Sequence, residues 1–171
     1  MGNADWQTPP WFFEACDRIW GPFEVDAAAS KANKLCPMRL GKEFGSGGGK
    51  PWPFEDKRVW LNPPYRNMAG WVETVIEEAK ERNNTTVLLG PIPRGDMWTI
   101  RLRNHAEIVE IDGRLKFIDP EKKGRAQPMG GNILAIVRPP LYGVVWPTGY
   151  TGMRLNLFGI QRFYEEGGGT T

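Results

Sequence analysis

The stretch that decides the fold is Arg58-Val59-Trp60-Leu61-Asn62-Pro63-Pro64-Tyr65. The valine, tryptophan and leucine at 59–61 favour an extended backbone and predict a short buried strand. Neither of the two prolines that follow has an N–H group to donate to a sheet, so the strand has to end at Asn62. We therefore expect Asn62 and Tyr65 at the carboxyl end of a strand, the edge where open α/β sheets bind their ligands.

The residues after this motif alternate between helix and strand. Apolar side chains at helical spacing predict an amphipathic helix, and they are Trp71, Val72, Val75, Ile76 and Ala79. A strand over 85–89, a helix over 97–102 and a strand over 107–111 follow. An apolar strand over 132–137 and a β-rich stretch over 144–146 complete the pattern. The alternation indicates an α/β sandwich with a largely parallel sheet.

A helix and a second strand are predicted before the motif. Thr8, which two prolines follow, is expected to cap and open a helix that ends before Gly21. The strand over 23–26 ends in Asp26. Because carboxyl ends of parallel strands share one edge, we expect the Asp26 and Asn62 side chains at the same edge of the sheet.

Small and flexible residues separate this strand from the motif. Ala27 and Ala28 follow the strand and allow a ligand to approach closely. Residues 31–57 show no periodic pattern and contain the glycine-rich segment 45–49, so we expect a surface loop there.

Composition sets the class of protein. A chain of 171 residues fits one domain, expected to span 1–171. Two cysteines and one histidine exclude a disulfide framework and a four-ligand zinc site of cysteine and histidine, and no metal is expected. The net charge of +2 does not by itself indicate nucleic acid. No apolar run is long enough for a membrane span and the start lacks the features of a signal peptide, so a cytoplasmic protein is expected.

The Asn62–Tyr65 motif suits the methylation of a planar amine. The lone pair of such an amine is conjugated with its ring, and the nitrogen becomes nucleophilic only when acceptors draw its hydrogens out of plane. The Asn62 side-chain oxygen and the Pro63 carbonyl can accept both hydrogens, and Pro63 and Pro64 stiffen the backbone there. Tyr65 offers a ring face on which an unstacked base can lie.

The motif resembles the catalytic motif of the amino-methyltransferases that act on adenine or cytosine amines in DNA. The wider chain, over about residues 6–138, resembles the small phage-type DNA adenine methyltransferases, the Dam-like phage family. The segments that carry this resemblance are Trp6-Gln7-Thr8-Pro9, residues 23–30 with Asn33, residues 59–65, Trp71, Leu88-Leu89-Gly90-Pro91, Arg114-Leu115-Lys116-Phe117 and Pro128.

The resemblance implies a Rossmann-like methyltransferase sandwich, S-adenosylmethionine as cofactor and adenine in double-stranded DNA as target, in the host cytoplasm if a phage encodes the protein. It implies cofactor contacts at two places, which are Thr8 and Pro9 before the first helix and Asp26, Ala27 and Ala28 after the strand. The chain lacks the Phe-x-Gly-x-Gly turn of most methyltransferases. The carboxylate that holds the cofactor's adenine stays unassigned, with Glu55 and Asp56 as candidates.

Basic residues are the candidates for DNA contacts. Arg94 lies before the helix over 97–102 and Arg101 and Arg103 lie on or next to it, while one polar loop carries Lys122, Lys123 and Arg125. Trp6 is expected either to pack in the core or to contact the cofactor or base.

Two other functions stay open at this point. The same pair of acceptors can serve an amino-methyltransferase that acts on RNA or on a protein glutamine. A non-catalytic nucleic-acid-binding module on the same fold is also compatible with the irregular cofactor motif.

Overall fold

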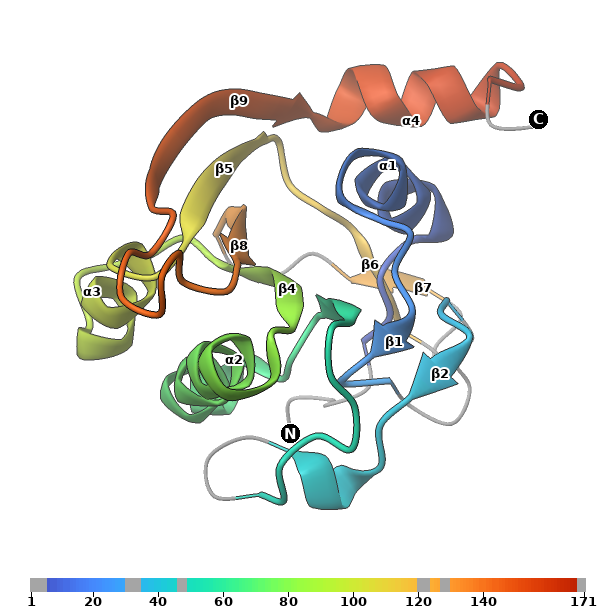
Figure 1. The fold of residues 1–171 in the computed structure, drawn as a ribbon. Helices are drawn as coiled ribbons and strands as arrows, with labels where there is room; N and C mark the ends of the chain where they lie inside the picture. Colours follow the sequence, from blue (N-terminus) through green and yellow to red (C-terminus); the bar gives the residue numbers. More distant parts are fainter. Residues whose placement is uncertain (1–5, 30–34, 46–48, 120–123, 127–129, 169–171) are drawn as a thin grey trace.

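One sheet with helices on both faces forms the structure, a computed structural model that describes residues 6–29, 35–45, 49–119, 124–126 and 130–168 (Figure 1). The helices are α1 (Pro10–Trp20), α2 (Met68–Arg82), α3 (Met97–Arg103) and α4 (Leu157–Glu165), with two 3-10 turns, η1 (Lys42–Phe44) and η2 (Tyr65–Asn67). The strands are β1 (Val25–Asp26), β2 (Met38–Arg39), β3 (Arg58–Leu61), β4 (Thr85–Pro91), β5 (Glu107–Asp112), β6 (Phe117–Asp119), β7 (Gly124–Ala126), β8 (Asn132–Val137) and β9 (Gly149–Asn156).

The sheet has seven strands in the order β2-β1-β3-β4-β8-β5-β9. Helices α2 and α3 pack against one face, and α1 and α4 against the other (Figure 1). Each face has its own apolar core, and the helix predicted over 71–79 buries all five of its predicted apolar side chains. These features confirm the predicted α/β sandwich.

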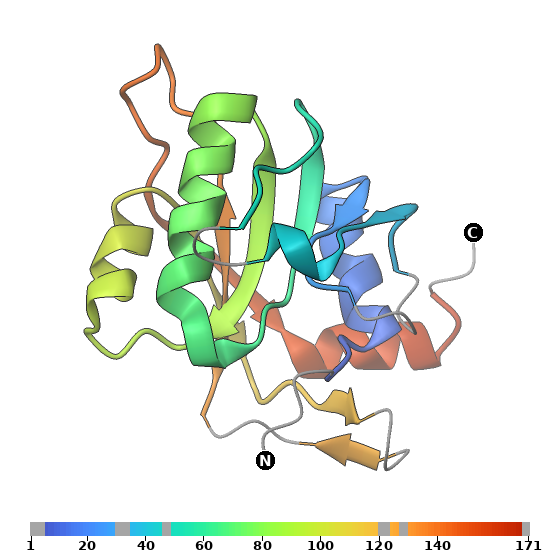
Figure 2. The same ribbon diagram turned by 90° about the horizontal axis from the view of Figure 1, so that it is seen from below.

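The sheet is mostly parallel, as predicted, but β8 runs against both of its neighbours. The chain returns from β5 to β8 through the β6–β7 ribbon, without a crossover helix. A neighbouring strand reached without a crossover pairs antiparallel. Because β8 is antiparallel to both β4 and β5, β5 runs parallel to β4 and β3. The carboxyl ends of β1, β3, β4 and β5 therefore share one edge, from which the β6–β7 ribbon projects (Figure 2).

This edge contains a switch in strand order. From β1 the chain moves to β2 on one side and then returns to β3 on the other side. Connections that leave in opposite directions open a crevice at the strand ends, which is where open α/β sheets bind ligands. Asp26 of β1 pairs in register with Trp60 of β3, two residues before Asn62, so the structure brings Asp26 and Asn62 to the same edge of the sheet on adjacent strands.

The prediction that Thr8 caps the first helix is wrong. Pro9 is the N-cap residue of α1, its carbonyl accepts the Phe12 and Phe13 N–H groups, and no side chain caps the helix. Two consecutive prolines place Thr8 one residue too far from the helix to cap it. The Thr8 hydroxyl is used instead at the edge of the sheet.

Part of the segment expected as a surface loop belongs to the core. β2 pairs with β1, and Trp52 is almost completely buried. The Trp52 N–H donates to Glu78 Oε1 (2.9 Å), and Asn84 Nδ2 donates to Glu78 Oε2 (3.1 Å). Burial raises the pKa of the Glu78 carboxyl, while the hydrogen bond from Trp52 lowers it. A carboxylate on α2 thus fixes the segment that leads into β3.

The C-terminal part also differs from the prediction. Residues 144–146 do not form a strand of the sheet, because Leu141 and Val145 close a tight turn. β9 follows and pairs in parallel with β5, and the unpredicted α4 begins directly after it. The Asn156 side chain caps α4 by accepting the Phe158 and Gly159 N–H groups. No helix in the described ranges is long and apolar enough to cross a membrane.

Replacing Glu78 tests the attachment of the 52–54 segment. Glu78→Ala leaves the buried Trp52 N–H without an acceptor and removes one of the two acceptors of Asn84 Nδ2, so we expect the free energy of unfolding to fall by about 1–3 kcal/mol. Urea denaturation measures this change. Glu77→Ala removes an exposed carboxylate from the same helix and should change stability by less than about 0.5 kcal/mol. Equal effects of the two substitutions would contradict this role for Glu78.

Candidate functional site

Asn62 is held at the end of β3 by a residue from the N-terminal segment. Its side-chain nitrogen Nδ2 donates to Thr8 Oγ1 at 3.1 Å. Thr8 is only 2% exposed, whereas Asn62 is half-buried at the edge. The bond occupies the amide nitrogen, and the amide oxygen is the atom left for a donor from outside. The structure therefore brings together Thr8 and Asn62, which lie 54 residues apart in sequence.

The two prolines of the motif fix the backbone next to Asn62. Pro63 is buried, while Pro64 is exposed and has φ −58° and ψ 125°. Pro64 is the residue before η2, which begins at Tyr65. Because Pro64 lacks an N–H and its ring restricts φ, the peptide unit that carries the Pro63 carbonyl has little freedom to rotate. The site thus offers a stiff backbone acceptor beside a side-chain acceptor.

Tyr65 is fixed at its hydroxyl end by a residue that the sequence did not indicate. The half-buried ring packs against the core under α2. Asn132 Nδ2 of β8 donates to Tyr65 Oη at 2.8 Å and more weakly to the Gly90 carbonyl at 3.3 Å. Burial raises the pKa of the Tyr65 phenol, and the bond from Asn132 lowers it. The phenol therefore stays neutral and serves as a hydrogen-bonding group.

Asn132 is an unusual residue for its position. It is 1% exposed and begins a strand whose six residues are all buried. Among the described residues no donor lies within hydrogen-bonding distance of its Oδ1 atom. A buried amide that opens an otherwise apolar strand was the only sequence signal for this residue, and it did not reveal the contact with Tyr65.

Asp26 supplies a buried carboxylate at the end of β1. It is 3% exposed, and its Oδ1 atom accepts the Ala28 N–H at 3.1 Å. Burial raises the pKa of this carboxyl to about 6, while the bond from Ala28 lowers it. Ala27 is buried and Ala28 is half-buried. The structure thus places a carboxylate with an altered pKa and two small side chains at the switch in strand order.

The N-terminal segment joins the β6–β7 ribbon to this site. Gln7 and Ile118 exchange two backbone hydrogen bonds of 2.9 Å each. The Trp6 ring stacks on Phe117 with a centroid distance of 6.4 Å, which favours the packing role for Trp6. Thr8, the partner of Asn62, directly follows this short pairing, and Pro9 is buried behind it.

The predicted DNA contacts are distributed unevenly. Arg94 is exposed in the segment after β4, at the same edge as Asn62. Arg125 lies in β7, where its backbone pairs with Ile118. Lys122 and Lys123 lie outside the described residues. Arg101 is paired with Glu73 of α2 (2.7 Å), and Arg103 lies at the last turn of α3, near the opposite edge.

The structure places both candidates for the cofactor-adenine carboxylate away from Asn62. Glu55 and Asp56 precede β3 and so lie at its amino end, opposite the edge that carries Asn62. The Asp56 side chain instead accepts a hydrogen bond from the Asn83 side chain. The backbone N–H of Asp56 donates to the Arg82 carbonyl (3.0 Å). These contacts attach the residue to the end of α2.

Comparison with known proteins gives consistent matches. The model of the family described as DNA N-6-adenine-methyltransferase (Dam) matches residues 2–145. A DNA N-6-adenine-methyltransferase of Escherichia phage T1 is 32% identical over 163 residues, which cover 85% of this chain and 67% of that protein. A protein of the same name from Haemophilus phage HP1 is 28% identical over 119 residues, which cover 68% of this chain and 67% of that protein. With the site geometry above, these matches show that the chain belongs to the Dam family of phage-type DNA N-6-adenine-methyltransferases.

Proposed function

We propose that this protein methylates adenine at specific sites in double-stranded DNA, by transferring a methyl group from S-adenosylmethionine to the N6 amine of a flipped-out base. The observation that carries the proposal is the hydrogen bond from Asn62 Nδ2 to Thr8 Oγ1. It commits the amide nitrogen to the protein and leaves the amide oxygen for a substrate amine. Membership of the family supports DNA adenine as the substrate.

Asn62 and Pro63 act together on the target amine. The Asn62 side-chain oxygen and the Pro63 carbonyl each accept one of its two hydrogens, which draws the nitrogen out of conjugation and makes its lone pair available. Both acceptors are fixed before the substrate arrives, so they stabilise the positive charge that develops on the amine without reorganising. The methyl group would replace one hydrogen, whose proton passes to water. The bond from the methyl group to the cofactor's sulfur would break, so the sulfonium would leave as the neutral thioether, S-adenosylhomocysteine.

Tyr65 holds the base. An adenine inside a duplex is not accessible to Asn62, so it has to leave the stack and be received by another surface. The Tyr65 ring offers such a surface, and the bond from Asn132 prevents the ring from swinging. Base stacking on an aromatic ring contributes about 1–3 kcal/mol.

The residues at the end of β1 fit the cofactor. When bound, S-adenosylmethionine supplies a sulfonium methyl group that an amine can attack. The ionised Asp26 carboxylate can accept hydrogens from hydroxyl or ammonium groups of the cofactor, and Ala27 and Ala28 leave space beside it. The proposed cofactor residues also include Thr8 and Pro9, because Thr8 lies beside Asn62.

The proposed contacts with DNA lie on the same edge. Arg94 is exposed there, and the ribbon that carries Arg125 projects from it (Figure 2). Lys122 and Lys123 lie in the sequence between β6 and β7, outside the described residues. Arginine and lysine at such places fix the duplex through its phosphates. We further propose one domain over 1–171 and action in the host cytoplasm, since the matched relatives come from phages.

Methyl transfer from labelled cofactor tests the function. The purified protein is incubated with unmethylated double-stranded DNA, with RNA or with a glutamine-containing protein, and the modified residue is then mapped. We expect label only in DNA, as N6-methyladenine at a short recurring sequence. Label in RNA or protein would overturn the proposed substrate. Binding of cofactor and DNA without transfer would indicate a non-catalytic module.

Substitutions of Thr8 distinguish two roles of its hydroxyl: holding the Asn62 amide or contacting the cofactor. Thr8→Val keeps the shape and removes the hydroxyl that holds the Asn62 amide, so kcat should fall by roughly 2- to 10-fold, the effect of one hydrogen bond. Thr8→Ser should restore kcat. Steady-state kinetics and cofactor titration measure both. A weaker cofactor affinity with unchanged kcat would instead assign the Thr8 hydroxyl to the cofactor.

The Tyr65 ring and its hydroxyl should contribute separately. Tyr65→Ala loses the stacked face, so the methylation rate should fall by roughly 5- to 150-fold. Tyr65→Phe keeps the face and loses only the bond from Asn132, so most activity should remain. Asn132→Ala should match Tyr65→Phe, and the double variant should be no worse than either single variant. Additive effects in this cycle would show that Asn132 does not act through Tyr65.

Asp26 should lower the stability of the protein at neutral pH. Its pKa of about 6 lies above the value of about 3.9 in unfolded chains. The folded state therefore binds more protons between these pH values, and the free energy of unfolding falls as pH rises through about 6. Relative to Asp26→Asn, the wild type should lose up to roughly 3 kcal/mol between pH 4 and pH 8. Thermal melts across this range measure the difference.

The same Asp26 variant tests cofactor binding. Cofactor affinity of the wild type should rise with pH through about 6, because binding requires the ionised carboxylate. Asp26→Asn should bind weakly at every pH. A wild-type affinity that does not vary with pH, together with unchanged affinity in the folded variant, would remove Asp26 from the cofactor site.

A further inference from the structure

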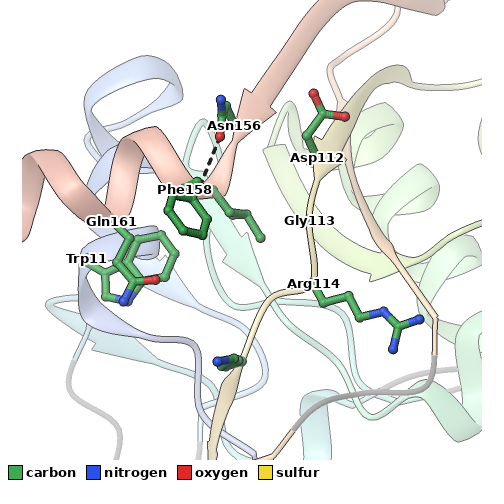
Figure 3. Close-up of a pocket in the computed structure, with 9 residues that line it drawn as sticks. Trp11, Asp112, Gly113, Arg114, Asn156, Phe158 and Gln161 are labelled. Atoms are coloured by element: carbon green, nitrogen blue, oxygen red, sulfur yellow. Dashed lines mark hydrogen bonds between the residues drawn. The ribbon is translucent and has the colours of Figure 1, made fainter.

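A cavity of about 450 Å³ lies beside the carboxyl ends of β5 and β9, several strands away from Asn62 (Figure 3). Three elements line it. The segment after β5 contributes Arg114 and Lys116, α1 contributes Trp11, and the β9–α4 junction contributes Asn156, Phe158 and Gln161. None of these residues is part of the methyl-transfer site described above.

The cavity lies on the same edge of the sheet as that site. β5 runs parallel to β3 and β4, because β8 is antiparallel to both β4 and β5. The carboxyl ends of β5 and β9 therefore face the same side as Asn62. β3 and β5 are separated by three strand spacings in the sheet order, which corresponds to about 14 Å.

Two positively charged side chains, Arg114 and Lys116, lie at this cavity on a segment that the core holds in place. Arg114 and Lys116 are exposed, whereas Leu115 and Phe117 between and after them are buried, so this segment is fixed and both cations point outward. Gly113 makes the turn out of β5 with φ +102°, a conformation that suits glycine.

Asp112 also lines the cavity but forms no ion pair with either cation. Asp112 is engaged by Arg154 of β9, with Nη2 at 2.7 Å from Oδ1. In the described part of the chain neither Arg114 nor Lys116 forms an ion pair. The cavity therefore carries an uncompensated positive charge that favours an anionic ligand.

The other wall is aromatic and exposed. Phe158 is 88% exposed at the first turn of α4, next to the Gln161 amide in Figure 3. The N–H groups of this turn are already satisfied, since Asn156 accepts those of Phe158 and Gly159. The anionic ligand is therefore expected at the two cations, and an apolar part of the ligand at Phe158.

We propose that this groove binds the sugar–phosphate backbone of the DNA duplex beside the target adenine. The inference rests on the proposed function. Arg114 and Lys116 contact phosphates, and Phe158 covers an adjacent sugar. The separation of about 14 Å between β3 and β5 corresponds to about four base pairs at a rise of 3.4 Å per base pair. The contact is therefore expected about four base pairs from the flipped base. A backbone contact at this distance adds affinity without adding sequence specificity.

The salt dependence of DNA binding tests the groove. The affinity of the full chain for a mixed-sequence duplex is measured between about 50 and 200 mM salt. Arg114→Gln and Lys116→Gln should each bind more weakly and reduce the slope of log K against log salt by about 0.9. Phe158→Ser should weaken binding without changing the slope. All three substitutions should raise KM for DNA and leave kcat at saturating DNA unchanged.

Arg103→Gln is the matched control, because it removes an exposed positive charge at the opposite edge, on α3. It should leave both affinity and slope unchanged. If Arg114→Gln and Lys116→Gln keep the wild-type slope of log K against log salt and the wild-type protein methylates DNA, the proposed DNA contact at this groove is wrong. The proposed function would then still stand. Equal losses in Arg103→Gln would also overturn the DNA contact at this groove, since the effect would then reflect net charge. Failure of the wild type to bind or methylate DNA would overturn the proposed function, and the groove with it.

Discussion

The two prolines after Asn62 cannot donate a hydrogen bond to a neighbouring strand, and this single constraint determines where β3 ends. Since β3 lies beside β1 at the switch in strand order, its end lies at the same edge of the sheet as Asp26. The fixed backbone makes the Pro63 carbonyl a stiff acceptor, and the η2 turn that follows directs Tyr65 toward β8. Acceptor, ring and carboxylate thus lie at one edge of the sheet because β3 ends where it does.

Two segments distant in sequence hold the side chains of the motif in place. Thr8 of the N-terminal segment orients the Asn62 amide, and Asn132 of β8 fixes the Tyr65 hydroxyl. The N-terminal segment also pairs with β6 through Gln7 and Ile118. The β6–β7 ribbon is therefore connected by backbone hydrogen bonds to the residue next to Thr8. In the proposed enzyme this arrangement links a DNA-contacting element to the side chain that accepts the target amine.

Local patterns were enough to predict the α/β sandwich, the apolar face of α2 and the shared edge of Asp26 and Asn62, because each depends on periodicity or on a proline stop. Contacts across the chain could not be predicted in this way. Thr8 has the residue type of a helix cap but serves Asn62, and Asn132 contacts a residue 67 positions away. Trp52 and Glu78 form one buried contact from a segment without any pattern. β8 is antiparallel because the chain reaches it from β5 without a crossover helix. The alternation of helices and strands in the sequence did not reveal this connection.

The central claim is that the Asn62 side-chain oxygen accepts a hydrogen of the target amine while Thr8 holds the amide nitrogen. Single-turnover methyl transfer to DNA, measured at saturating cofactor, tests it most directly. Asn62→Ala should lower the transfer rate by roughly two to three powers of ten, the size of losing one preorganised group, with cofactor affinity almost unchanged. Asn62→Asp keeps an acceptor oxygen and should retain partial activity. A folded Asn62→Ala protein that transfers the methyl group at the wild-type rate would contradict the claim.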